Sequence, residues 1–302
     1  MDGILIIDKP AGITSHDVVF RVRRLLKTKR VGHTGTLDPF ATGVMVILVG
    51  QATRMAQFLD KDAKEYVAAI RFGFETDTGD LTGNRLGESS VSDEDVSKRL
   101  TGVDWDATFA PFRGAIQQVP PMYSAKKIDG KKLYELARKG ETVERKAADV
   151  TIHQLELLGN EPLDNPAATI NVLVACSAGT YIRTLAEDIG RKVGIGAHLT
   201  GLRRTKAGKF TIEQSITLEQ LAELADPATA LIAIETAVSH LPIFTVATDR
   251  VTKTRNGMST RVYDQVFSEN EPISMVDDTG KLLAVGFFDT TENAVQPKVV
   301  LV

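Results

Sequence analysis

Residues 32–49 read GHTGTLDPFATGVMVILV, a polar loop that runs directly into six consecutive apolar residues. The apolar run Val44–Val49 is rich in valine and favours a buried central strand. The loop before it combines glycines, which let a backbone approach a ligand, with the polar side chains of His33 and Asp38. This loop is therefore the first candidate for a functional site.

The composition of the loop alone leaves several interpretations open. Asp38 precedes Pro39, which biases the aspartate toward an extended conformation. Its carboxylate could carry chemistry, or it could simply bond backbone amides in a tight turn. A phosphate-binding loop is a weaker interpretation, because the glycine spacing and the lysine of a P-loop are missing.

Patterning on both sides of the loop predicts alternating strands and helices. Apolar residues at helical spacing after Thr14 or Ser15, either of which could be the N-cap, predict a helix through Leu26. Expected strands lie at residues 4–7, 64–73, 150–158, 169–175 and 209–212. Expected helices lie near residues 92–100, at the end of 117–140, and after the 177–180 loop through residue 191. Helical segments at 218–237 look like a connector to a last unit of roughly 60 residues.

Composition restricts the class of protein. The chain has 302 residues, of which 43% are hydrophobic, which is enough for a soluble enzyme with one large core and a smaller one. The run Val44–Val49 is far shorter than the roughly 18 residues of a membrane span. Acidic residues near the start argue against a signal peptide, and Cys176 as the single cysteine excludes an internal disulfide, so we expect a cytoplasmic protein.

Charge is unevenly distributed along the chain. The net charge of −3 alone argues against a nucleic-acid partner. Residues 1–212, however, carry 30 basic and 26 acidic residues, whereas residues 213–302 carry 6 basic and 13 acidic residues. The first two-thirds could face a polyanion, and the last third should repel one.

Five segments, in order, resemble the TruB family of pseudouridine synthases. The loop of residues 32–43 is similar to the G-H-x-G-x-L-D-P-x-A-x-G pattern around the active-site aspartate of that family. The other matching segments are IDKPAGITSHDVV at 7–19, PPMYSAKKIDGKKLYELARKG at 120–140, SAGTYIRTLAEDIG at 177–190 and AHLTGLRRTKAGKF at 197–210. The resemblance implies an α+β pseudouridine synthase fold with a mixed, mainly antiparallel central sheet and flanking helices. It also implies a catalytic domain at 1–240, an RNA-binding thumb insertion at about 113–146 and a small PUA-like domain at 241–302.

The resemblance makes Asp38 the catalytic carboxylate, which either attacks the anomeric carbon of the ribose or removes a proton from the ribose. Both schemes need an ionised aspartate, and Arg183 matches the family arginine that pairs with it. Without the family, Arg183 would be interpreted as a surface arginine at the start of a helix.

Other site residues follow from the same resemblance. Tyr66 matches the tyrosine that packs on the flipped base and helps with the proton lost from carbon, and Tyr181 and Leu202 match pocket positions. His33 matches a histidine that supports the displaced base or the bent RNA. Taken alone, these residues would be an ordinary strand tyrosine, core residues and a structural histidine.

Three basic clusters, at 21–30, 126–138 and 203–209, could bind phosphates, although such runs are usually solvated faces. The middle cluster lies in the segment that resembles the thumb of the family, with tyrosines interleaved for stacking. The expected phosphate-binding residues there are Lys126, Lys127, Lys131 and Lys132.

The resemblance implies isomerisation of uridine to pseudouridine in the T arm of tRNA, at position 55. We expect no cofactor, since the reaction involves no redox change or group donor, and no metal, since the five histidines lack metal-ligand spacing. We also expect a monomer with no membrane partner. The alternatives are a non-catalytic chaperone that folds tRNA in the same cleft and, ranked last, the related synthase of guide-RNA particles, whose lysine-rich tails are missing here.

Overall fold

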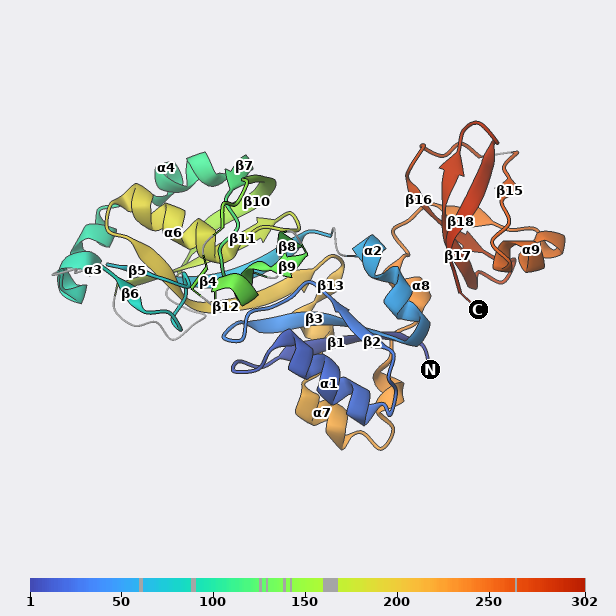
Figure 1. Ribbon diagram of the computed structural model, residues 1–302, viewed down its shortest axis with the longest axis horizontal. Helices are drawn as coiled ribbons and strands as arrows, with labels where there is room; N and C mark the ends of the chain where they lie inside the picture. Colours follow the sequence, from blue (N-terminus) through green and yellow to red (C-terminus); the bar gives the residue numbers. More distant parts are fainter. Residues whose placement is uncertain are drawn as a thin grey trace.

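The computed structural model describes residues 1–59, 62–87, 91–124, 127–128, 130–137, 140–141, 143–159, 168–263 and 265–301. A large sheet flanked by helices occupies most of the chain, and a smaller sheet at the C-terminal end lies to one side of it (Figure 1). None of the helices in the described ranges combines the length and the apolar character that a bilayer span requires.

The larger sheet contains nine strands within the described residues and runs in the order β1-β3-β12-β4-β11-β10-β7, with β2 paired to β3 and β13 paired to β12. The strands are β1 (Gly3–Lys9), β2 (Val31–Thr34), β3 (Thr42–Val49), β4 (Lys64–Phe72), β7 (Gly114–Gln118), β10 (Ala148–Leu158), β11 (Thr169–Cys176), β12 (Ala197–Ala207) and β13 (Phe210–Thr211). Only the β3–β12 pair is parallel among these pairings. The prediction of a mixed, mainly antiparallel sheet is therefore confirmed.

Strand β3 is buried along seven of its eight residues because both of its faces are covered. Met45, Ile47 and Val49 pack toward helix α1, while the alternating residues between them face a second apolar cluster. This explains why the sequence of β3 is a continuous apolar run and does not alternate between apolar and polar residues.

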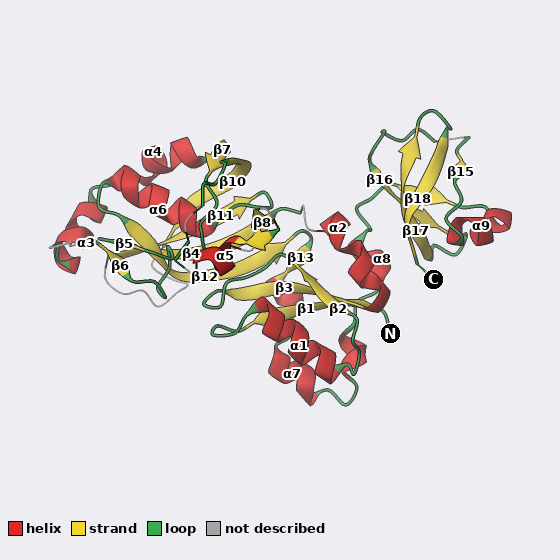
Figure 2. Cartoon of the chain, in the orientation of Figure 1, coloured by secondary structure: helices red, strands yellow, loops and turns green. Residues whose placement is uncertain are grey.

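The helices cover the sheet on both sides (Figure 2). Helix α1 (Ser15–Leu25) starts at a capping box in which Thr14 and Asp17 satisfy each other's backbone amides, and its buried valines pack on β1 and β3. Helix α6 (Ile182–Val193) places Leu185 and Ile189 against β4, β11 and β12. The remaining helices of this part are α2 (Ala56–Leu59), α3 (Asp93–Thr101), α4 (Trp105–Phe109), α5 (Leu133–Ala137), α7 (Leu218–Glu223) and α8 (Ile234–Ala237).

Short elements connect the longer strands and helices of the described residues. Two hairpins are formed by β5 (Glu75–Thr76) with β6 (Arg85–Leu86) and by β8 (Lys127–Ile128) with β9 (Lys131–Lys132). Five 3-10 turns lie at Gly50–Met55, Ala110–Phe112, Ile212–Gln214, Pro227–Ala230 and Thr248–Arg250. The thumb boundaries at about 113–146 remain a prediction.

The segment expected as a connector, 218–237, contains α7, a 3-10 turn and α8, and it also packs against the larger sheet. Leu218 and Leu221 of α7 are buried against α1 and β1, and Ile232 exchanges backbone hydrogen bonds with Ile4. The segment is packed on both faces of β1, because α7 shares the cluster of α1 on one face and Ile234 and Ala237 of α8 join the cluster on the other face.

The smaller sheet has the order β14-β16-β17-β18-β15 and encloses its own apolar cluster. Its elements are β14 (Ile243–Thr245), α9 (Val251–Arg255), β15 (Thr260–Arg261), β16 (Pro272–Val276), β17 (Leu282–Asp289) and β18 (Ala294–Val300). Leu282, Val285 and Val299 also join the cluster that includes Ile234 and Val238 of the larger part. The boundary at residue 240 and the PUA-like assignment stay predictions.

Candidate active site

Asp38 lies in the loop between β2 and β3, and two buried side chains hold that loop. Ser15 Oγ donates to the carbonyl oxygen of Leu37 at 2.9 Å and accepts from the Leu37 amide at 2.8 Å. Lys9 Nζ donates to the carbonyl oxygens of Pro39 at 3.2 Å and Ala41 at 2.7 Å. The residues on either side of Asp38 are thus tied to α1 and β1, which fixes the direction of the carboxylate.

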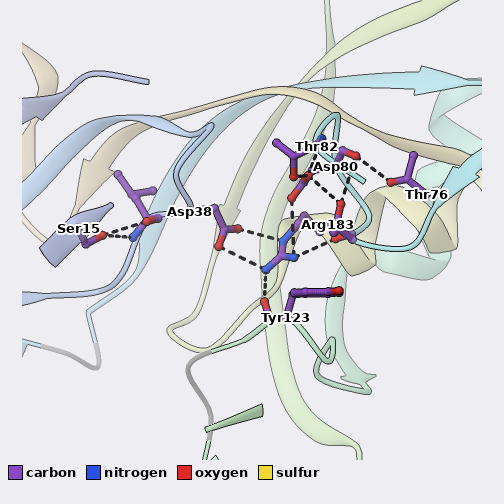
Figure 3. Close-up of polar contacts among 9 residues, drawn as sticks. Ser15, Asp38, Thr76, Asp80, Thr82, Tyr123 and Arg183 are labelled. Atoms are coloured by element: carbon purple, nitrogen blue, oxygen red, sulfur yellow. Dashed lines mark hydrogen bonds and ion pairs between the residues drawn. The ribbon is translucent and has the colours of Figure 1, made fainter. Parts of the chain in front are cut away.

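Arg183 meets Asp38 through a two-pronged contact (Figure 3). Its Nε lies 3.0 Å from Asp38 Oδ2, and its Nη2 donates to Asp38 Oδ1 at 3.4 Å. The planar guanidinium suits this geometry because it offers parallel donors to both oxygens of a carboxylate. Arg183 is only 5% exposed, so the interpretation as a surface arginine is wrong.

The rest of the Arg183 guanidinium is also engaged. Nη1 donates to the carbonyl oxygen of Thr78 at 2.9 Å, and Nη2 donates to the carbonyl oxygen of Tyr123 at 2.6 Å. The carboxylate of Asp80 lies 3.8 Å from Nη1 and accepts hydrogen bonds from Thr82. Three chain segments therefore converge on one cation, which restricts its movement relative to Asp38.

Burial raises the pKa of the Asp38 carboxyl above its ordinary value, because the charged form loses water. The Arg183 guanidinium opposes this shift, Asp80 adds to it, and the Lys9 ammonium opposes it. Burial also lowers the pKa of Lys9 to about 8, so this lysine remains mostly charged at neutral pH. Asp38 is therefore a poorly solvated carboxylate held beside two cations, an environment typical of reactive carboxylates.

A cavity of about 230 Å³ opens beside Asp38. Its walls include Tyr66, Tyr181, Arg183 and Leu202, which are four of the residues expected at the site. This volume is below the roughly 300–1,000 Å³ of sites for drug-sized ligands and suits a single flat base. Burial raises the pKa of the Tyr66 phenol, and the neighbouring Arg204 guanidinium opposes that shift.

His33 does not join this group, and the roles expected for the thumb lysines stay predictions. His33 is half-buried on β2, its Nδ1 has no hydrogen-bond partner among the described residues, and it is not among the described residues that line the cavity. Burial and the nearby Arg204 lower its pKa, which favours a neutral ring. Lys127, Lys131 and Lys132 lie on the β8–β9 hairpin, and Lys126 falls outside the described residues.

The sequence interpretation missed four charged residues at or beside the cavity, of which Lys64 at the start of β4 lines it directly. Asp80 lies in TDTGDLTGN at 76–84, whose residue types are typical of turns. Lys9 lies in the segment 7–19, where the family resemblance gives this lysine no role. Arg204 is 1% exposed and donates to the carbonyl oxygens of Val44 and Gly35. In the cluster at 203–209, the burial of Arg204 keeps it away from a phosphate, and Arg203 pairs with Asp8 at 2.7 Å, while phosphate binding by the rest of the cluster stays a prediction.

Among the described residues, no group of three or more His, Cys, Asp or Glu side chains is arranged to hold a metal ion. Cys176 is buried, and burial raises the pKa of its thiol to about 11, so the thiol stays protonated at neutral pH. The chemistry available at the cavity is therefore that of a carboxylate, a phenol and several fixed cations.

Comparison with known proteins points to one family. A family model described as TruB family pseudouridylate synthase (N terminal domain) matches residues 23–182, and one described as tRNA pseudouridylate synthase B C-terminal domain matches residues 183–238. A tRNA pseudouridine synthase B from Bacillus pumilus is 39% identical, with 100% of this chain and 98% of that protein covered. Another from Cupriavidus metallidurans is 51% identical over 75% of this chain and 69% of that protein. A crystal structure of a Cbf5-Nop10-Gar1 complex matches with a TM-score of 0.73 and 27% identity, over 99% of this chain and 84% of that chain.

Proposed function

Because this chain belongs to the TruB family of pseudouridylate synthases, we propose that it isomerises uridine to pseudouridine at position 55 in the T arm of tRNA. The observation that carries the proposal is the Asp38–Arg183 pair at a cavity of about 230 Å³. The names of the relatives, tRNA pseudouridine synthase B, support tRNA as the substrate class.

The proposed reaction balances within the substrate. The glycosidic bond between N1 of uracil and C1′ of ribose breaks, the base turns, and a bond from C5 to C1′ forms. The proton on C5 leaves and N1 gains one, so no external donor or acceptor of electrons is required. The enzyme therefore has to supply a reactive group at the sugar, a holder for the loose base and a route for one proton.

Asp38 is proposed to act at the sugar, either as a nucleophile at C1′ or as a base that removes a ribose proton and later returns it. Arg183 orients the carboxylate and favours its charged form. Reduced solvent around Asp38 strengthens its attraction to Arg183 and to positive charge that develops at the sugar, because charges interact more strongly where water is scarce. The half-buried position of Asp38 and its buried partner Arg183 thus serve the same chemical step.

Tyr66, Tyr181 and Leu202 are proposed to hold the flipped uracil, because their aromatic and apolar surfaces line the cavity. Tyr66 is also proposed to assist in moving the C5 proton. His33 would support the displaced base or the bent RNA beside the loop. Phosphate contacts are proposed for the thumb lysines, Lys126, Lys127, Lys131 and Lys132.

The direct test is to incubate the purified chain alone with unmodified T-arm RNA and to map pseudouridine. We expect product at a single uridine without any guide RNA or protein partner. A requirement for guide RNA would contradict the tRNA assignment. Binding and refolding of tRNA without any product, unchanged by Asp38→Asn, would favour the non-catalytic chaperone instead.

A further inference from the structure

Gln118 is the last residue of β7, where the expected thumb leaves the central sheet, and it is 2% exposed. Its Oε1 accepts from the amide of Tyr181 at 3.0 Å, and its Nε2 donates to the carbonyl oxygen of Tyr181 at 3.3 Å. One side-chain amide therefore satisfies both backbone polar groups of a single distant residue. Such a contact holds the backbone in place more firmly than one hydrogen bond would.

Tyr181 is the N-cap residue of α6, a position that usually holds serine, threonine, aspartate or asparagine. The tyrosine side chain makes no capping hydrogen bond to the helix. The Gln118 side chain instead holds the N-cap backbone from outside the helix. A residue of β7 therefore adds to the start of α6, where the Tyr181 carbonyl oxygen also accepts the first helical hydrogen bond from the Leu185 amide at 3.1 Å.

Arg183 follows Tyr181 by two residues, in the first turn of α6. A shift of this turn would move the guanidinium relative to Asp38, whose own loop is separately held by Ser15 and Lys9. The segment that begins with Gln118 makes a second contact here, because the carbonyl oxygen of Tyr123 accepts from Arg183 at 2.6 Å. The root of the thumb therefore holds both the backbone that carries Arg183 and the guanidinium itself.

We propose that Gln118 is a positioning residue for the isomerisation, acting through Tyr181 on the Asp38–Arg183 pair. The inference rests on the proposed function, since its measurement is pseudouridine formation. Without the two hydrogen bonds, the first turn of α6 loses its attachment to β7, and we expect a small shift that the other contacts of Arg183 only partly oppose. A misplacement of about 1 Å at a catalytic pair can cost on the order of 100-fold in rate.

The test compares Gln118→Met with Gln220→Met in the full chain. Gln220 is a matched control, because its Oε1 accepts from the Thr217 amide at 2.9 Å at the start of another helix, α7, which carries no site residue. For Gln118→Met we expect a single-turnover rate at saturating T-arm RNA lowered by about 10- to 100-fold, with RNA affinity within about twofold.

We also expect the acidic limb of the pH–rate profile of Gln118→Met to move to higher pH. Burial raises the pKa of Asp38, and Arg183 opposes this rise. If Arg183 attracts the carboxylate less strongly, the pKa of Asp38 therefore rises further. A purely structural role would lower the amount of folded protein without moving this limb. Gln220→Met should leave the rate, the affinity and the limb unchanged.

The proposal is overturned if Gln118→Met keeps the wild-type rate, or if it loses rate only in proportion to its unfolded fraction while the limb stays in place. If Gln118→Met does not fold, Gln118→Glu replaces it, because that variant keeps the shape and the acceptor but loses the donor to Tyr181. A Gln118→Glu rate within twofold of wild type overturns the proposal, and a larger loss with a shifted limb supports it. A wild-type chain that makes no pseudouridine would instead contradict the proposed function itself.

Discussion

The Asp38 cleft and the C-terminal five-stranded sheet bury different kinds of side chain. At the cleft, five charged side chains are buried: Lys9, Lys64, Asp80, Arg183 and Arg204. In the C-terminal sheet, the buried polar residues within 243–263 and 265–300 carry only hydroxyls: Thr254, Thr260 and Ser274. One region buries charge and the other avoids it.

Burying a charge costs several kcal/mol unless partners compensate. At the cleft the partners are present, since Lys9 and Arg204 donate to backbone carbonyls and Arg183 meets Asp38 and Asp80. The C-terminal sheet buries an apolar cluster and, among its described residues, no charged side chain, so it carries no such cost. We infer that stability is given up at the cleft in favour of chemistry, and the following variants test this contrast.

The largest effect is expected for Asp38→Asn. The amide keeps the shape but loses the charge needed at the sugar, so turnover should fall by at least about a thousandfold while RNA binding is kept. The measurement is single-turnover pseudouridine formation at saturating RNA. Asp278→Asn, at an exposed aspartate of the other region, is the control, and residual turnover of Asp38→Asn within about tenfold of wild type would contradict the assignment.

Arg183→Lys should lower the single-turnover rate by about 100-fold, because a point charge cannot reproduce the two-pronged hold on Asp38. The acidic limb of the rate profile should also move to higher pH, since Arg183 is the main group that opposes the raised pKa of Asp38. Arg191→Lys is the matched control, because Arg191 lies on the same helix but pairs with Glu75 on the exposed side. Equal rates for the two variants would remove Arg183 from the site.

Replacing Lys126, Lys127, Lys131 and Lys132 by glutamine should weaken RNA binding and leave the rate at saturating RNA nearly unchanged. Each lost phosphate contact should reduce the slope of log affinity against log salt by roughly 0.7 to 0.9. Binding titrations over a range of salt concentrations measure this slope. Lys98→Gln, at an exposed lysine elsewhere, should not alter it, and an unaltered slope in the fourfold variant would mean that these lysines are only solvated.

A chain that ends at His240 should keep its rate on an isolated T-arm hairpin but bind whole tRNA several-fold more weakly. The expected basic edge of this acidic unit is formed by Arg250, Lys253, Arg255 and Arg261, of which Arg250 and Arg261 line a cavity of about 910 Å³ together with Asp249 and Glu292. Truncation should also lower the thermal stability, because it uncovers Ile234 and Val238. Loss of activity on the hairpin in the folded, truncated chain would show that the catalytic part extends beyond residue 240.

The smallest effect is a rise in the melting temperature of Asp38→Asn at neutral pH. The pKa of Asp38 is raised in the folded chain above 3.8, so ionisation of this group opposes folding. The penalty is absent below the unfolded pKa, grows as pH rises toward the folded pKa, and is constant above it. Melting curves of wild type and variant should therefore converge at acidic pH, and a variant that is less stable at pH 7 would contradict this account.

Local patterns predicted much of the fold. The apolar run of β3 and the Thr14 cap of α1 are encoded within a few residues, so the strand and the helix follow from spacing and capping. The segment at 218–237 was predicted as helical for the same reason, but not as a packed layer. Helical propensity depends on neighbours in the sequence, whereas packing depends on which distant surface remains uncovered.

For the site, the sequence by itself determined the loop that carries Asp38, because glycines, proline and aspartate are contiguous there, and family resemblance added Arg183. Only the tertiary structure decided that Asp80, Lys9 and Gln118 belong to the same network. These three residues contact backbone carbonyls, amides and charged groups of segments that are distant in the sequence. Such contacts produce no regular spacing of residue types that could be recognised in the sequence. A hydrogen bond or an ion pair depends on separation in space, and only the folded sheet brings these groups within about 3 to 4 Å of their partners.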